Sequence, residues 1–340
     1  MLRISSLLPI LLILASGFAC AAGPALPAAQ AGPALLHIDG EPVFAAELDF
    51  WLRNVGKYYL ASRKLERIDD WSAQQNGMPL REYLVSSAVE YVRRDRVIEA
   101  QAASRGIRLG ADQELDILNA RTEQMRIYGS DAEYGRVVAS MYGSEALFDY
   151  LTRIELLGDA VFADLFGAGG ERCDDDCVTA YAAREHLMPA RTLHFAAKDP
   201  ANRTLSAGER RANRRKLHAV LARLRADPSP AAAFAAEAND GGPQFALAQS
   251  DARLPVVLER LKPGEISGVI STDQGDWLIL RMAIDPAMPV DAAGHSLRRQ
   301  AAYDSLFKPW VLDRARAQSI ERLPALGQLD VPGLLAETSR

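Results

Sequence analysis

Cysteine and histidine side chains gather in one short stretch, where they could bind a metal ion. The stretch contains Cys173, Cys177, His186 and His194. Zinc uses these ligand types, but compact zinc sites usually place their two histidines about three to five residues apart. The interval from His186 to His194 is longer than that, with seven residues between them. We therefore expect no metal site and no cofactor.

The start of the chain has the pattern of a secretory signal. A basic start precedes an apolar run over residues 7–18, which is shorter than the ~20 residues that span a bilayer. Ala19-Cys20-Ala21 then supplies a small-x-small cleavage pattern. We expect export, removal of residues 1–21 and no membrane span afterwards. A lipid anchor at Cys20 is the less favoured alternative. A lipoprotein cysteine usually has Leu three positions before it, and this sequence has Gly17 there.

After that cleavage two cysteines remain, Cys173 and Cys177. An even number of cysteines in an oxidising compartment favours a disulfide. Their i, i+4 spacing in the first turn of a helix would put the Cα atoms ~6–7 Å apart, near the upper limit for a disulfide. The sequence leaves open whether they form a bridge or stay as two thiols.

Three consecutive aspartates, Asp174–Asp176, resemble a metal-binding loop but are better explained as the start of a helix. Asp is a favoured N-cap residue, and acidic side chains in the first turn suit the helix dipole. Before this point, apolar residues recur at helical spacing. We expect helices over 48–59, 80–104, 111–128, from 131, and over 144–166.

The periodicity changes after residue 190. A short strand over 191–198 comes before a strongly basic helix over 206–226 and a shorter helix over 231–239. One or two helical turns over 252–261 and two strands, 266–271 and 277–284, complete the pattern. This order predicts a small α+β unit with helices packed on a sheet. The basic helix is most simply a solvated face.

The composition is that of an ordinary globular protein, and the net charge argues against one class of partner. Charged residues make up 24% of the chain and hydrophobic residues 49%, which are ordinary values for a globular protein. The formal net charge of −5 makes nucleic acid an unlikely main partner, because proteins that bind nucleic acid are usually basic.

Two parts of the chain resemble known families. Residues 190–285 resemble a parvulin-type peptidyl-prolyl isomerase domain, through Ala190-Arg191-Thr192-Leu193-His194-Phe195, Leu261-Lys262-Pro263-Gly264-Glu265 and Gly275-Asp276-Trp277-Leu278. The helical region 36–185 is similar to the chaperone module of exported SurA/PrsA-type foldases. Its markers are Ile38-Asp39-Gly40-Glu41-Pro42-Val43, Gly77-Met78-Pro79-Leu80 and Ala103-Ser104-Arg105-Gly106-Ile107.

The parvulin resemblance implies a site. His194 falls at the first-strand histidine and Asp240 at the acidic position, so these two are the candidate catalytic residues. Phe245, Leu254 and Trp277 are the candidate substrate-binding residues. Trp277 stands where the family has a second histidine, so the usual histidine pair cannot form. An enzyme of this kind would need no covalent chemistry, because a pocket that binds the twisted amide lowers the barrier.

The resemblance also implies an organisation: a mostly α protein with an inserted α+β domain. We expect a helical chaperone domain over 35–186, completed by a C-terminal helix within 292–321, and a parvulin-like domain over 187–286. An Ala/Pro/Gly linker over 22–34 would precede them, and residues 322–340 would form a loose tail.

Three functions are compatible with these features. The chain could be an exported, periplasmic or extracytoplasmic, isomerase that acts on Xaa-Pro bonds. It could also be a chaperone that binds unfolded or extended polypeptides and whose parvulin-like unit only binds, or an accessory dedicated to one secretion or assembly partner. The incomplete pocket favours the chaperone over the isomerase.

Overall fold

The structure is a computed structural model that describes residues 32–239, 251–291 and 293–337. The expected signal, the first part of the linker, Asp240 and Phe245 lie outside these residues. The chain forms two compact units. Unit 1 contains the chain up to Leu165 and again from Phe307, and unit 2 comprises Phe166–Leu306. The expected fold class is confirmed, because the protein is mostly α with an α+β unit between the two segments of unit 1.

Unit 1 begins with a hairpin of β1 (Ala34–Ile38) and β2 (Glu41–Phe44). Asp39 and Gly40 form the turn with φ values of 51° and 86°, as a type I′ hairpin turn requires. The third strand, β8 (Ile320–Arg322), pairs antiparallel with β1. The sheet order is therefore β2-β1-β8.

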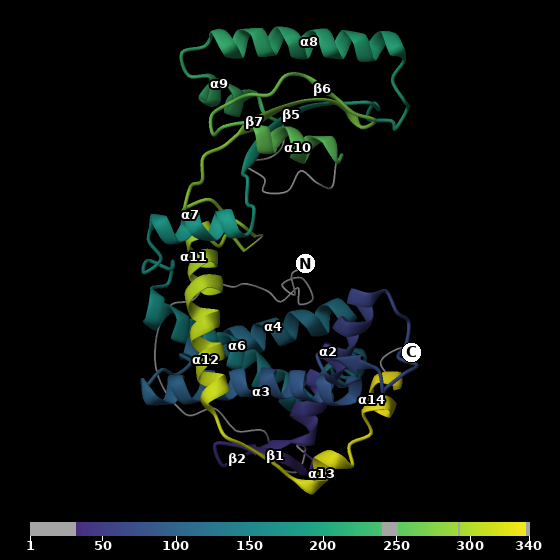
Figure 1. The fold of residues 1–340 in the computed structure, drawn as a ribbon, viewed down its shortest axis with the longest axis vertical. Coiled ribbons are helices and arrows are strands. Elements are labelled where there is room, and N and C mark those ends of the chain that lie inside the picture. Colours follow the sequence, from purple (N-terminus) through teal and green to yellow (C-terminus); the bar gives the residue numbers. More distant parts are fainter. Residues whose placement is uncertain (1–31, 240–250, 292, 338–340) are drawn as a thin grey trace. The chain divides into compact units, whose positions relative to one another are not determined.

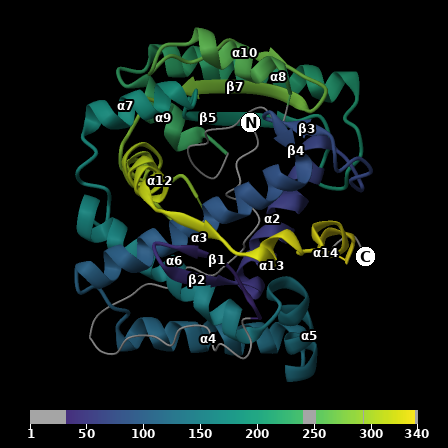
Figure 2. The ribbon, with the colours of Figure 1, turned by 60° about the horizontal axis from the view of Figure 1, so that its bottom comes forward.

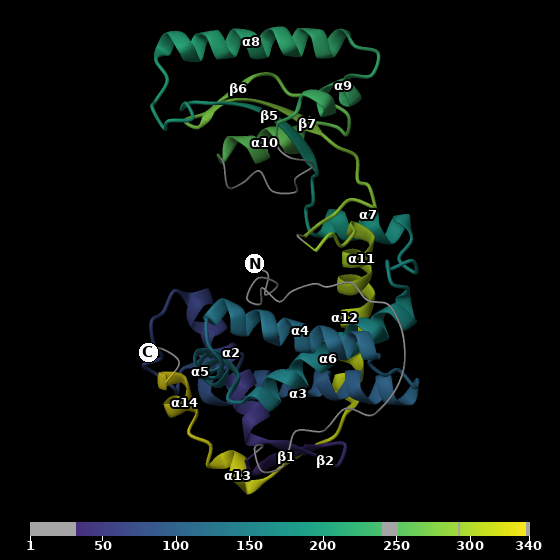
Figure 3. The ribbon, with the colours of Figure 1, turned by 180° about the vertical axis from the view of Figure 1, so that it is seen from behind.

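Helices make up most of unit 1 (Figure 3). In chain order they are α2 (Ala45–Arg63), α3 (Leu80–Ser104), α4 (Ala111–Tyr128), α5 (Asp131–Tyr142), α6 (Glu145–Phe166), whose last residue falls in unit 2, and α12 (Lys308–Ala317). A short pair, β3 (Gln74–Gln75) and β4 (Met78–Pro79), precedes α3. The expected span of α3 is confirmed, and Gly106 ends that helix with φ 67° in the geometry of a Schellman cap.

The C-terminal segment belongs to the core of unit 1, so the expectation of a loose tail after residue 322 was wrong. Figure 2 shows α13 (Pro324–Gly327) beside β1. The next helix, α14 (Val331–Glu337), packs on α2. Leu326, Val331 and Leu335 are buried among side chains of β1, α2 and α3. Turn residues suggested disorder here, but the apolar residues between them bury enough surface to order the segment.

Unit 2 starts earlier and ends later than expected for the α+β domain. It includes α7 (Asp175–Arg184), which packs against α11 (Leu297–Ala302). The boundaries expected from the sequence assign both helices to the helical domain instead. The side chain of Asp174 caps α7 by accepting a hydrogen bond of 2.9 Å from the backbone N–H of Cys177, as predicted.

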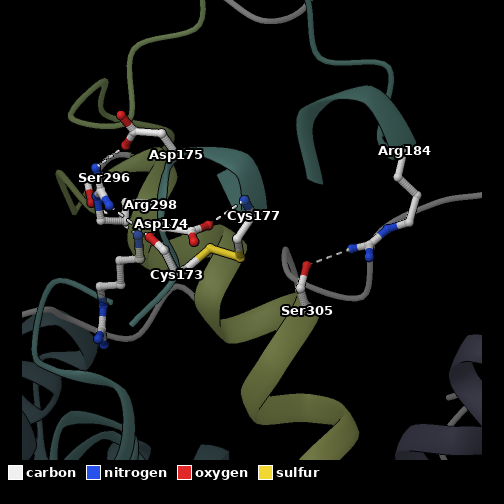
Figure 4. The surroundings of a disulfide bond; sticks show 9 residues. Cys173, Asp174, Asp175, Cys177, Arg184, Ser296, Arg298 and Ser305 are labelled. Carbon is white, nitrogen blue, oxygen red and sulfur yellow. Dashed lines mark hydrogen bonds and ion pairs between the residues drawn. A yellow bond between two sulfur atoms is a disulfide. The ribbon is translucent and has the colours of Figure 1, made fainter. Parts of the chain in front are cut away.

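A disulfide joins Cys173 to Cys177 beside this cap (Figure 4). The Cα atoms are 5.3 Å apart, closer than the sequence estimate, because Cys173 precedes the N-cap and is not in the helix. Arg298 holds the same turn from α11, donating to the carbonyl of Cys173 at 2.8 Å and to Asp175 at 2.6 Å.

The sheet of unit 2 has β7 (Gly275–Arg281) between β5 (Ala190–Ala196) and the two-residue β6 (Ile270–Ser271). Helices cover both of its faces (Figure 1). On one face, α8 (Ala207–Ala226) and α9 (Pro230–Glu237) bury Leu193, Leu278 and Leu280. On the other face, α10 (Arg253–Arg260) covers Trp277 and Ile279.

The last helix of unit 2 leads directly into unit 1. A π-helical turn, η2 (Tyr303–Phe307), joins α11 to α12 just before Pro309. The irregularity lies next to this proline because proline cannot donate the backbone hydrogen bond that continues an α-helix. No helix within the described ranges is long and apolar enough to cross a membrane.

Candidate functional site

The candidate site lies where β5 and β7 pair in unit 2. His194 is directly opposite Trp277 in the antiparallel register, so both side chains point to the face of the sheet that α10 covers. Their rings stack with centroids 3.6 Å apart and planes 11° from parallel. The structure therefore brings together the two predicted site residues that come from the two strands.

Both ring N–H groups of this pair are bonded within the protein. Nε2 of His194 lies 3.1 Å from the carbonyl oxygen of Gln274, which can only accept, so we assign the ring proton to Nε2. Nε1 of Trp277 donates to Oγ1 of Thr272 at 3.1 Å. Burial lowers the pKa of His194 below its usual range, so this imidazole is neutral at pH 7.

The backbone around His194 is held from two sides. Asn239 bonds to the edge of β5, its side chain accepting from the N–H of His194 at 2.9 Å and donating to its carbonyl at 2.8 Å. Gly275 lies under the imidazole with φ 145°. A Cβ at Gly275 would lie 2.2 Å from the carbonyl oxygen of Phe195 and 2.6 Å from Nε2 of His194. The close approach of β7 to the histidine therefore requires glycine.

Of the other predicted site residues, Asp240 and Phe245 lie outside the described ranges, and Leu254 does not open a pocket beside the pair. Leu254 of α10 is 0% exposed and packs with Trp277, Leu258 and Ile279 in the core, so it presents no surface to a ligand. Trp277 itself is 8% exposed. A hollow of about 380 Å³ lies elsewhere in unit 2, lined by residues including Asp175, Pro286 and Arg298.

Sequence reasoning missed a second polar group on the opposite face of the same strands. Asp276 is 2% exposed and accepts from Arg214 of α8 at 3.2 Å and from Oγ of Ser271 at 2.5 Å. The alternation of β7 places Asp276 and Trp277 on opposite faces. The sequence signal was an aspartate inside a strand that is otherwise apolar, because such a buried charge requires a partner.

Comparisons with known proteins give only distant structural similarity. No model of a known protein family matches the chain, and no curated protein matches it. A SurA-like chaperone of Campylobacter jejuni aligns at 13% identity and TM-score 0.28, over 86% of this chain and 99% of that one. PrsA of Bacillus subtilis aligns at 15% identity and TM-score 0.29, over 73% of this chain and 90% of that one. The foldase PrsA of Streptococcus pneumoniae aligns at 14% identity and TM-score 0.28, over 73% of this chain and 93% of that one. At these TM-scores the alignments carry no argument about activity or partners.

Proposed function

We propose that this chain is an exported folding factor that binds unfolded or extended polypeptides. The observation that carries the proposal is a group of large apolar side chains left exposed on the α4–α5 hairpin of unit 1. Leu115 is 54% exposed, Leu118 56%, Ile127 59% and Met141 48%. Leu115 and Leu118 are three residues apart and therefore lie next to each other on α4, and contiguous exposed apolar side chains are typical of surfaces that bind other proteins.

This exposure is not a failure of the hairpin to fold. The two helices pack against each other (Figure 3), and Ile117, Tyr134 and Val138 are buried. The hairpin therefore has an inner apolar side for its own core and further apolar residues on its outside. Single exposed apolar residues are ordinary on a protein surface; four on one hairpin are better explained by a partner that covers them.

In this proposal the α+β unit binds clients without efficient catalysis. Isomerisation of an Xaa-Pro bond needs a pocket that takes the twisted amide out of water. Here the rings of His194 and Trp277 cover each other, and both of their N–H groups are bonded to neighbouring residues. The pair can offer an aromatic edge to an extended polypeptide. Neither ring N–H can donate to a carbonyl group of that polypeptide unless its present hydrogen bond breaks.

Aggregation suppression with two unrelated unfolded clients tests the binding function. We expect the chain from Ala22 onwards to protect both clients. The double variant Leu115→Ser/Leu118→Ser should need about thirtyfold higher concentration for the same protection, because each leucine contributes about 1 kcal/mol when half of its surface is covered. The matched control is Leu65→Ser/Val256→Ser, whose side chains are each 46% exposed outside the hairpin. Equal losses in both double variants would contradict a role for α4–α5. Protection of one client alone would favour an accessory dedicated to one partner.

Prolyl isomerisation is the second candidate function, favoured by the position of His194 on the first strand of the sheet. Exchange NMR on a panel of Xaa-Pro peptides distinguishes the two. We expect shifts from binding without faster cis/trans exchange, and we expect His194→Ala to retain client binding. Acceleration that disappears in His194→Ala would instead make the protein an isomerase that works without a second histidine.

A further inference from the structure

Helix α8 concentrates positive charge on an otherwise acidic protein. Its twenty residues include seven Lys or Arg side chains and one acidic side chain, Glu209. The helix therefore carries a net charge of +6, and because the whole chain carries −5, the remaining residues carry −11. The capping box of Ser206 and Glu209 fixes the start of the helix, so these charges lie on a regular scaffold.

Some of these cations are held by contacts with the sheet or with α9, and others have no acidic partner within the described ranges. Arg214 pairs with Asp276, and Arg223 pairs with Glu237 of α9. Arg210 donates to the carbonyl of Thr272 at 3.1 Å. Among the residues that the structure describes, no acidic partner faces the exposed side chains of Arg211, Arg215, Lys216 and Arg225.

The exposed cations that have no acidic partner in the described part of the chain flank the side of α8 that faces away from the sheet. Leu217, Leu221 and Leu224 point to the sheet and are buried. At 100° per residue, Arg211, Arg215 and Arg225 fall within one quarter of the helix circumference, centred about 110° from the leucine face, and Lys216 lies about 110° from that face on the other side. Figure 1 shows α8 as a straight helix along the outside of unit 2. From Arg211 to Arg225 this row of charge extends for about 20 Å.

We propose that this face of α8 adsorbs to an anionic lipid bilayer. The residues between the cations include Ala219, Ala222 and Ala226, which are small, and no large apolar side chain lies with them. A polypeptide partner would need apolar contacts or a groove for stable binding. A planar surface of phosphate headgroups needs only a row of cations, each of which contributes about 1 kcal/mol near such a surface. The acidic remainder of the chain would be repelled, which orients α8 towards the membrane.

Cosedimentation with lipid vesicles tests the proposal, using the chain from Ala22 onwards so that the apolar leader cannot bind lipid by itself. We expect binding to vesicles of equimolar phosphatidylglycerol and phosphatidylcholine, no binding to phosphatidylcholine alone, and loss of binding between about 0.05 M and 0.5 M NaCl, because salt screens the charges. In the variant Arg211→Gln/Arg215→Gln/Lys216→Gln/Arg225→Gln we expect the partition coefficient to fall several-hundredfold, about fivefold for each cation removed.

The matched control changes the net charge by the same amount elsewhere. Arg67, Arg126, Arg136 and Arg316 are at least 71% exposed and each pairs with a nearby acidic residue. Replacing all four by Gln should leave most of the binding intact. An equal loss in this control, or equal binding to phosphatidylcholine, would overturn the proposal. So would binding of poly-glutamate with no binding to anionic vesicles, which would identify an acidic polypeptide as the partner. If the fourfold variant does not fold, the double variant Arg211→Gln/Arg225→Gln decides the question, because removal of two cations should lower the partition coefficient about 25-fold.

Discussion

Side chains of α2, α3 and α6 form a buried cluster of polar groups in unit 1. Arg96 donates to Glu47 at 2.8 Å and to Glu99 at 2.8 Å, and Tyr150 donates to Glu47 at 3.5 Å. Asp95 next to them accepts from Nε1 of Trp51 at 3.0 Å. Glu47 and Asp95 are 3% and 9% exposed, so two buried carboxyl groups and the partly exposed Glu99 share this site with one central guanidinium.

These carboxyl groups titrate differently in the folded and unfolded protein. Burial raises the pKa of Glu47 from 4.5 to about 7 against the opposing effect of Arg96, and burial also raises the pKa of Asp95 well above its usual value. The folded state therefore holds more protons than the unfolded state from about pH 4.5 to about pH 7. Linkage then requires the free energy of unfolding to decrease as the pH rises through this window.

The substitution Glu47→Gln should remove the part of the pH dependence of unfolding that arises from Glu47. As the pH rises from 5 to 8, we expect the unfolding free energy of the variant to increase by about 2 to 3 kcal/mol relative to that of the unmodified protein. The reason is that the amide carries no charge to bury. Urea unfolding at the two pH values measures the difference. Glu66→Gln, at an exposed position, is the control. If the difference between Glu47→Gln and the unmodified protein is the same at both pH values, Glu47 is not the titrating group.

Among the secondary-structure elements, α14 is the one whose importance is least apparent from the sequence. It approaches α2 so closely that a Cβ on Gly56 would lie 2.5 Å from Cδ2 of Leu335. Gly56 is therefore a contact position within α2, where glycine otherwise disfavours a helix. The two helices and β1 enclose one apolar core with α3.

Leu335→Ala should consequently destabilise unit 1, although the residue is five positions from the last residue of the sequence. We expect a loss of about 2 to 4 kcal/mol in the free energy of unfolding, because the substitution leaves a cavity in the core. The same substitution at Leu65, which is 46% exposed, should cost less than about 1 kcal/mol. Chemical denaturation of both variants gives the comparison, and similar costs would mean that α14 does not stabilise the core.

At the scale of the whole molecule, unit 2 is inserted in the sequence between the two segments of unit 1. His37 of β1 pairs with Glu321 of β8 in the sheet register, and all of unit 2 lies between them in the sequence. Unit 1 cannot complete its sheet or its core until the residues after unit 2 have been synthesised. Unit 2 has no such requirement, since it is one continuous segment. The charge of the molecule is also uneven, because α8 is basic and the remainder is acidic.

The sequence by itself determined the local structure and fold class of this protein. The limits of α3, the cap at Asp174 and the turn at Asp39-Gly40 follow from periodicity, capping and turn residues. These signals act between residues within a turn or two of each other, so they can be read without knowledge of the fold. The same signals separated the helical part of the chain from the α+β part.

Only the tertiary structure decided which distant residues meet. The stacking of His194 on Trp277 depends on the register of β5 and β7, and a shift of one residue would have placed Trp277 on the other face. Likewise, the contacts of Glu47 with Arg96 and of Gly56 with Leu335 depend on how helices from separate segments pack. The free energy of burial depends on the whole set of neighbours that cover a side chain, and those neighbours are far away in the sequence.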